Sequence, residues 1–92
     1  MPIFVFTYYT MKLFVKGIEP SINEVALEAY FSQFGKVVST KIIYDRITWE
    51  SRGFGFIEYL KKDDALKAIE KLNGTELKGK ILSVSEAEEK RK

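Results

Sequence analysis

The stretch RGFGFIEY, residues 52–59, decides the fold. Successive side chains of a β-strand point to opposite faces of a sheet, so alternate residues share a face. Gly53, Gly55, Ile57 and Tyr59 share one face of this segment. Phe54 and Phe56 lie on the other face. We expect the glycines to let a helix approach the backbone closely on the buried side. The phenylalanines then face water, where clustered rings favour aggregation unless a partner covers them.

The composition predicts one small domain without thiol or metal chemistry. The chain has 92 residues, of which 46% are hydrophobic and 14% aromatic, enough for a single core. It contains neither cysteine nor histidine, so disulfides, thiolate metal sites and imidazole acid–base catalysis are excluded. The 15 basic and 13 acidic residues leave a net charge of +2, so charge alone does not predict a nucleic-acid partner. No apolar run approaches the ~20 residues that span a bilayer, and we expect no cofactor and no membrane partner.

Hydrophobic periodicity predicts six elements in the order β-α-β-β-α-β. The segment SINE (21–24) matches a capping box, in which Ser21 and Glu24 begin a helix, and Gly35 would end that helix in the left-handed conformation. A second helix is expected over residues 63–73. The predicted strands cover residues 11–17, 37–44, 52–59 and 80–87. This order is typical of an α+β, ferredoxin-like sandwich, with a four-stranded antiparallel sheet and two helices on one face.

The sheet face that the helices leave open gathers aromatic rings and cations. In the first strand Leu13 and Val15 suit the core, so Phe14 joins the two phenylalanines of the third strand on the open face. The cations expected on that face are Lys12, Lys16 and Arg52. Nucleobases stack on aromatic rings, and the phosphates that link them need positive charge nearby. The open face is therefore suited to a single-stranded nucleic acid.

Two segments resemble the signatures of the RNA recognition motif family. RGFGFIEY follows the longer signature position by position: basic, glycine, aromatic, glycine, aromatic, aliphatic, any residue, aromatic. LFVKGI, residues 13–18, resembles the shorter signature on the first strand, and the two lie in the expected order on the expected elements. The resemblance covers residues 11–88. It implies a domain that binds single-stranded RNA in post-transcriptional regulation, with single-stranded DNA left open as a ligand.

The resemblance also implies roles for individual residues. Phe14 and Phe56 would stack under two successive bases, with Phe54 against the sugar between them. Arg52 would reach a phosphate. The remaining contacts implied or expected on the open face fall to lysines, to outward residues of the second and fourth strands, and to the main chain that follows: Lys12, Lys16, Lys41, Ile43, Ser83, Ser85 and Ala87.

Trp49 departs from the family pattern, which commonly has a glycine near this point of the loop. Two interpretations stay open at the level of sequence. The indole either packs down as an anchor of the loop or reaches over the open face and clamps a base. On substitution of Trp49 by alanine, the first interpretation predicts lower stability and the second predicts lower RNA affinity.

Several expectations concern the ends of the chain and other functions. Residues 1–10 form an aromatic extension, which is either a start-site artefact before Met11 or an extra strand that shields the open face or mediates self-association. Residues 89–92 form a charged tail. The alternative function is a protein-binding module that uses the same aromatic face. An acyl-phosphate hydrolase on a similar sandwich would need an arginine in the turn KGIEP (16–20), which has none, so we expect no enzyme. The expected location is intracellular, in the cytoplasm, or in the nucleus of a eukaryote.

Overall fold

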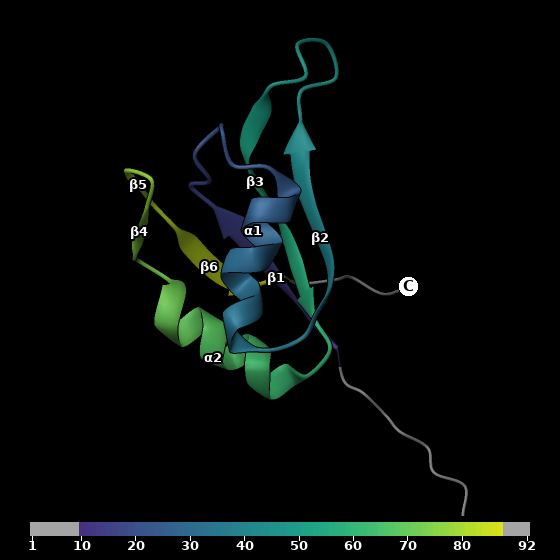
Figure 1. The fold of residues 1–92 in the computed structure, drawn as a ribbon, viewed down its shortest axis with the longest axis vertical. Helices are drawn as coiled ribbons and strands as arrows, with labels where there is room; N and C mark the ends of the chain where they lie inside the picture. Colours follow the sequence, from purple (N-terminus) through teal and green to yellow (C-terminus); the bar gives the residue numbers. More distant parts are fainter. Residues whose placement is uncertain (1–9, 88–92) are drawn as a thin grey trace, which may run out of the picture.

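The computed structural model describes residues 10–87, and its elements follow the expected order with two additions, a 3-10 turn after the first helix and a short hairpin before the last strand (Figure 1). The main sheet contains β1 (Met11–Lys16), β2 (Val37–Tyr44), β3 (Ser51–Tyr59) and β6 (Ser83–Glu86). These strands are antiparallel and lie in the order β2-β3-β1-β6, so β1 and β3 are central. The predicted ferredoxin-like α+β architecture is confirmed.

Helices α1 (Glu24–Phe31) and α2 (Lys62–Leu72) both lie on one face of the sheet (Figure 1). On that face the central strands are fully buried at Leu13, Val15, Ile57 and Tyr59. The Tyr59 hydroxyl donates a hydrogen bond of 2.6 Å to the carbonyl oxygen of Phe31, which joins β3 to the end of α1. Burial raises the pKa of Tyr59, with a smaller contribution from the nearby charge of Asp64, so the hydroxyl keeps its proton.

Helix α1 starts and ends differently from the sequence prediction. Its N-cap is Asn23, whose side-chain oxygen accepts a hydrogen bond of 2.8 Å from the backbone N–H of Ala26. The capping box with Ser21 is therefore wrong, because the Ser21 hydroxyl donates to the carboxylate of Glu19. After the helix, the chain makes one 3-10 turn, η1 (Ser32–Phe34), and Gly35 follows with φ 156° and ψ −176°. That conformation is not the left-handed helical one that was expected.

The fourth strand of the sheet is shorter than predicted. Residues 80–87 were expected to form one strand, but the first two belong to a separate hairpin of β4 (Glu76–Leu77) and β5 (Lys80–Ile81). The break falls at Leu82, which is buried and donates its N–H to the carbonyl oxygen of Thr75. Because this hydrogen bond leads back toward the hairpin, only β6 joins the main sheet.

Each outer strand of the sheet has one backbone N–H bonded by a side chain from a helix end. On β2 the N–H of Ile42 donates to the carboxylate of Glu24 at 2.8 Å. On β6 the N–H of Val84 donates to the side-chain oxygen of Asn73 at 2.9 Å. Exposed strand edges are the usual route of unwanted strand pairing. These two side chains therefore protect the edges at which a further strand would add.

The two glycines of β3 serve a different neighbour from the one predicted. A Cβ built on Gly55 would lie 2.2 Å from the carbonyl oxygen of Lys41, so the close approach is that of strand β2 and not that of a helix. Gly53 has φ 82°, a left-handed conformation that favours glycine. Its carbonyl oxygen accepts the N–H of Ile18 at 2.9 Å and so fixes the turn after β1 to the entry of β3.

Two further properties of residues 10–87 bear on function. No three Asp or Glu side chains of these residues lie close enough together to hold a metal ion. Neither α1 nor α2 combines the length and the apolar character of a membrane-crossing helix.

Candidate nucleic-acid interface

The open face is defined here as the face of the main sheet away from α1 and α2, within residues 10–87. The strand register arranges its side chains in rows that run across the sheet. From β2 to β6, the middle row contains Lys41, Phe56, Phe14 and Ser85. The row on one side contains Ser39, Glu58 and Lys12, and the row on the other side contains Phe54, Lys16 and Ser83. Aromatic rings thus occupy the centre of the open face, with charged and hydroxyl side chains around them.

Phe14, Phe54 and Phe56 form one contiguous aromatic cluster. The ring centroid of Phe14 lies 5.3 Å from that of Phe56, with the planes 30° apart. It lies 5.8 Å from that of Phe54, with the planes 71° apart. All three side chains are half-buried and lie on the open face, as predicted. The helices cover the opposite face, so the helical layer does not bury these rings.

Lysine side chains border the aromatic cluster. The Nζ atom of Lys12 lies 6.0 Å from the ring centroid of Phe56, and that of Lys16 lies 5.9 Å from the centroid of Phe14. Both distances are at the limit of cation–π attraction. Lys41 is exposed on β2, and its Cα partner is Phe56. Positive charge therefore lies beside each of the two paired rings.

An open hollow of about 360 Å³ lies where the aromatic cluster meets the end of β6. Phe14, Phe56, Glu86 and Ala87 line it. The N–H of Ala87 donates to the carbonyl oxygen of Lys12 at 2.8 Å, which extends the pairing of β1 with β6. Two aromatic rings and the end of β6 therefore line the hollow together, a combination that suits a flat base.

A second open hollow, of about 470 Å³, lies beside the loop between β2 and β3. Ile43 and Phe54 contribute apolar surface, and Arg46 and Arg52 contribute positive charge. The remaining lining residues are Tyr44, Asp45 and Ile47. Ile43 is half-buried and lines this hollow together with Phe54, at a point where the strand register is interrupted, and its contact with RNA stays a prediction.

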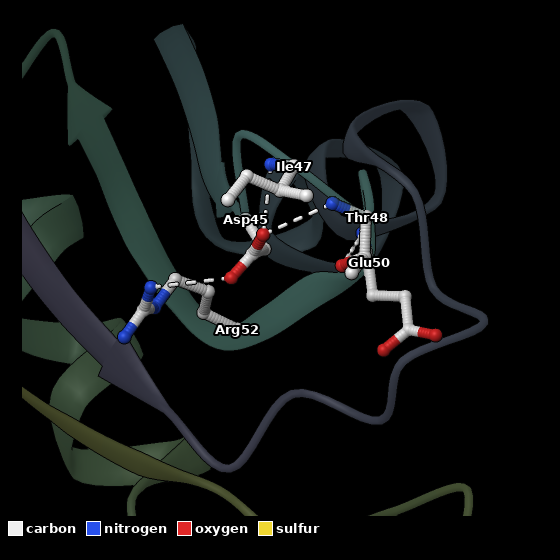
Figure 2. A network of polar contacts seen from close by, with 5 residues as sticks. All are labelled: Asp45, Ile47, Thr48, Glu50 and Arg52. Atoms are coloured by element: carbon white, nitrogen blue, oxygen red, sulfur yellow. Dashed lines mark hydrogen bonds and ion pairs between the residues drawn. The ribbon is translucent and has the colours of Figure 1, made fainter.

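Asp45 organises the loop between β2 and β3, as Figure 2 shows. One carboxylate oxygen accepts the N–H of Ile47 at 2.8 Å and the N–H of Thr48 at 3.0 Å. The other lies 3.7 Å from the guanidinium of Arg52. Hydrogen bonds from Thr48 and Ile47 hold the pKa of the Asp45 carboxyl below its usual range, with a smaller contribution from Arg52. Arg52, expected at a phosphate, thus already has an anionic neighbour.

Trp49 lies in the same loop with 74% of its side chain exposed. Its φ of 64° is left-handed, which explains why glycine is the expected residue here. The backbone N–H of Trp49 donates to the carbonyl oxygen of Asp45 at 2.8 Å, which closes the turn. Because the indole is exposed, the interpretation of Trp49 as an anchor that packs down is wrong.

Sequence reasoning missed two acidic residues of this region. The role of Asp45 could have been predicted, because an aspartate in a polar connector commonly accepts a hydrogen bond from the backbone N–H two residues later, here that of Ile47. Glu58 lies on the open face of β3, opposite Lys12 and Ser39, and no role was predicted for it from the sequence. The structure brings its carboxylate 3.4 Å from the hydroxyl of Ser39 on β2. Ser83 and Ser85, by contrast, are exposed as predicted, opposite Lys16 and Phe14.

Curated relatives align with most of the length of this chain. The Glycine-rich RNA-binding protein of Daucus carota is 44% identical over 77 residues, which are 84% of this chain and 49% of that protein. The chain therefore spans about half the length of that relative. The aligned length is close to the extent of the domain that the two signatures indicate.

Solved structures and the family model also match this chain over most of its length. The RNA-binding protein PG1 has a TM-score of 0.83 and 39% identity, over 89% of this chain and 99% of that one. A Sxl-Lethal protein/RNA complex has a TM-score of 0.80 and 32% identity, over 84% of this chain and 47% of that one. The family description of the RNA recognition motif matches residues 13–83. With that match, and with both signatures lying on the central strands, the chain belongs to the RNA recognition motif family.

Proposed function

We propose that the chain binds single-stranded RNA on the open face of its sheet. Phe14 and Phe56 stack under two successive bases, and Phe54 packs against the sugar between them. The aromatic cluster carries the proposal: its rings lie 5.3 to 5.8 Å apart, on the two central strands and outside the helical layer. A folding role alone does not account for this position. Similarity to a protein solved together with RNA adds support.

The phosphates of the strand meet the lysines that border the rings. The Nζ atoms of Lys12 and Lys16 lie 6.0 and 5.9 Å from the ring centroids of Phe56 and Phe14. Each lysine can therefore contact the phosphate next to a stacked base. Lys41 extends this charge toward β2. Arg52 contacts a phosphate by exchanging or sharing its contact with Asp45. On the β6 side, the main chain at Ala87 contacts a base edge in the first hollow, and Ser83 and Ser85 contact base edges from their outward positions opposite Lys16 and Phe14.

The expected affinity follows from the number of stacking platforms. Each stacked base contributes ~1–3 kcal/mol. Two or three platforms therefore supply roughly 2–9 kcal/mol before the cost of ordering the strand is subtracted. This corresponds to a dissociation constant of about micromolar or weaker.

Trp49 is proposed to clamp a base at the second hollow. The exposed indole lies in the loop that borders the apolar surface of Ile43 and Phe54. Replacing Trp49 by alanine then lowers RNA affinity and leaves the unfolding free energy nearly unchanged. An unaltered affinity, measured by fluorescence anisotropy of labelled RNA, would remove Trp49 from the interface.

Residues 1–10 lie outside the described residues except for the last, and their role is a separate proposal. We propose that this aromatic extension mediates self-association, at a surface other than the protected N–H groups of the sheet edges. Deletion of residues 1–10 then shifts the monomer–dimer balance toward the monomer in sedimentation measurements. An unchanged balance, together with an unchanged RNA affinity, would contradict any role in self-association or in shielding the open face.

The family membership favours a binding domain over an enzyme, and the proposed partner favours action inside a cell. RNA is made and used in intracellular compartments, so we propose the cytoplasm, or the nucleus of a eukaryote, as the location. Single-stranded DNA can stack on the same rings, because the stacking does not depend on the 2′-hydroxyl. Competition between RNA and DNA of the same sequence measures that preference.

The test of the proposed function is a titration with a random single-stranded RNA pool at low and high salt. Binding of the pool that weakens as the salt concentration rises is the expected result, since released counterions contribute to affinity. A chain that ignores the pool under both conditions would instead act as a protein-binding module on the same face, and the proposal would be wrong.

A further inference from the structure

One side chain of the open face has a charge that RNA binding alone does not explain. The outward positions of the four main strands carry lysine, arginine, phenylalanine, isoleucine and serine, which suit an RNA ligand. Glu58 is the exception, and it is the one carboxylate that the strand register places on this face among the strand residues of the described chain. A negative charge there repels phosphates, so a favourable contact of Glu58 with RNA has to be made with a base.

The position of Glu58 brings it to the edge of one particular base. It lies two residues beyond Phe56 on the same strand and face, a separation of about 7 Å. A base stacked on the Phe56 ring is wide enough to bring one edge within hydrogen-bonding distance of a glutamate side chain at that separation. The Ser39 hydroxyl on β2 lies 3.4 Å from one carboxylate oxygen of Glu58, a long hydrogen bond, and Lys12 is the Cα partner of Glu58 on β1. Glu58 is half-buried between these two neighbours.

Glu86 is the acid that has to be distinguished from Glu58, because it borders the first hollow. Its Cα partner is Leu13, which is fully buried on the helix side of the sheet. Side chains of directly paired residues share a face, so the register places the Glu86 side chain on the helix side of the sheet, although the residue also borders the hollow. The two glutamates thus differ in the face to which their carboxylates belong.

The chemistry of a carboxylate selects among the four bases. An ionised carboxylate only accepts hydrogen bonds, and it can accept two at once. The Watson–Crick edge of guanine presents two adjacent donors, N1–H and the N2 amino group. Adenine and cytosine present one amino donor beside an acceptor, and uracil presents one N–H between two carbonyl oxygens. Guanine is thus the base whose edge complements the carboxylate at both oxygens.

We propose that Glu58 makes the base stacked on Phe56 a guanine, by accepting hydrogen bonds from its N1–H and N2 amino groups. The inference rests on the proposed function, since it requires that a base stacks on Phe56. A purely structural Glu58, which only pairs with its cross-strand neighbours, would affect stability and overall affinity but not the choice of base.

The experiment compares short RNA ligands on the full chain. Dissociation constants are measured for hexauridylate and for the same hexamer with its third nucleotide replaced by guanosine, adenosine, cytidine or inosine. Guanosine is expected to bind about ten-fold more tightly than uridine, the range of a bidentate contact to a base. Inosine lacks the N2 amino group and is expected to lose most of this preference, while 7-deazaguanosine, which keeps both donors, is expected to retain it.

Variants of the protein separate base choice from charge. Glu58→Gln is expected to bind hexauridylate more tightly, because a negative charge is removed, and to lose the preference for guanosine. Glu70→Gln makes the same change of charge at an exposed position of α2, on the other face of the sheet, and is expected to keep the preference. Equal affinity for guanosine and uridine, or for guanosine and inosine, would overturn the inference while leaving RNA binding intact. A preference that survives Glu58→Gln or disappears in Glu70→Gln would also overturn it. Failure of every hexamer to bind would instead contradict the proposed function itself.

Discussion

Strand β3 has two faces that differ in almost every property, although their residues alternate along one segment. On the helix side Ile57 and Tyr59 are fully buried, and Gly55 lies against the backbone of β2. On the open face Phe54 and Phe56 are half-buried and lie in contact distance of the Phe14 ring, with no helix over them. The comparison teaches that folding and binding depend on alternate residues of the same strand, so mutations can separate the two properties.

The largest effect on binding is expected from removing both paired rings of the open face. The double variant Phe14→Ala with Phe56→Ala loses two stacking platforms and about 2–6 kcal/mol of RNA affinity, which is at least ~30-fold in the dissociation constant. Its unfolding free energy changes by less than this, because neither side chain is fully buried. Fluorescence anisotropy with labelled single-stranded RNA and thermal unfolding measure the two quantities. RNA affinity equal to that of the wild type would mean that the rings of the open face do not bind RNA.

The largest effect on folding is expected from Gly55→Ala on the helix side of the same strand. The new Cβ would lie 2.2 Å from the carbonyl oxygen of Lys41, so β2 has to shift, at a cost of about 2–3 kcal/mol in the free energy of unfolding. Gly79→Ala is the matched control, since no atom lies within 4 Å of its Cβ and only the left-handed φ of 88° is strained. The control is expected to cost about 1 kcal/mol. Equal costs in urea unfolding would show that the contact with β2 is relaxed.

A smaller effect on folding alone is expected from Tyr59→Phe. The variant leaves the Phe31 carbonyl oxygen without its hydrogen bond, which lowers the free energy of unfolding by about 1–2 kcal/mol and leaves RNA affinity unchanged.

The contribution of Tyr59 also depends on pH. Burial raises the pKa of Tyr59 in the folded chain, so its hydroxyl ionises first in the unfolded chain, near pH 10. Its stabilising contribution is therefore complete below about pH 10 and is lost as the pH rises above that value. The difference in unfolding free energy between wild type and Tyr59→Phe should thus shrink from pH 8 to pH 11. A difference that stays constant would mean that the hydroxyl is not protected from ionisation.

The smallest effect is expected at the loop, which belongs to neither face of the sheet. In Asp45→Asn the side-chain oxygen still accepts the N–H groups of Ile47 and Thr48, but the negative charge beside Arg52 is removed. Arg52 then contacts phosphate without competition, and RNA affinity rises by about three-fold. Asp63→Asn makes the same change of charge on α2, away from the open face, and should leave the affinity unchanged. Similar gains for both variants would mean that only net charge matters.

Alternation was the part of the structure that the sequence could predict well. The hydrophobic pattern of β1 and β3 assigns Phe14, Phe54 and Phe56 to the open face, because inverting the assignment would bury lysine and arginine side chains. The same pattern, with the apolar stripes of the helices, is sufficient for the order of elements and for the ferredoxin-like sheet. These features follow from the periodicity within each segment, so they can be predicted from residues that are close together in the chain.

The features that the sequence did not predict depend on contacts between distant residues or on a choice between similar ones. Ser21 and Asn23 are both good caps, and only the position of the chain decides between them. The break at Leu82 depends on a hydrogen bond to Thr75, and the need for glycine at position 55 depends on the path of β2. The pairing of Arg52 with Asp45 likewise requires the loop to fold back.

Locating the RNA on the protein tests most directly whether the open face of the sheet is the binding surface. Backbone amide shifts of the isotope-labelled chain, recorded during titration with a short single-stranded RNA, report which residues change environment. If RNA binds the open face, the largest shifts are expected on β1, β3 and the end of β6, around Phe14, Phe56 and Ala87. Little change is expected on α1 and α2. Shifts concentrated on the helices, with the open face unaffected, would contradict this expectation.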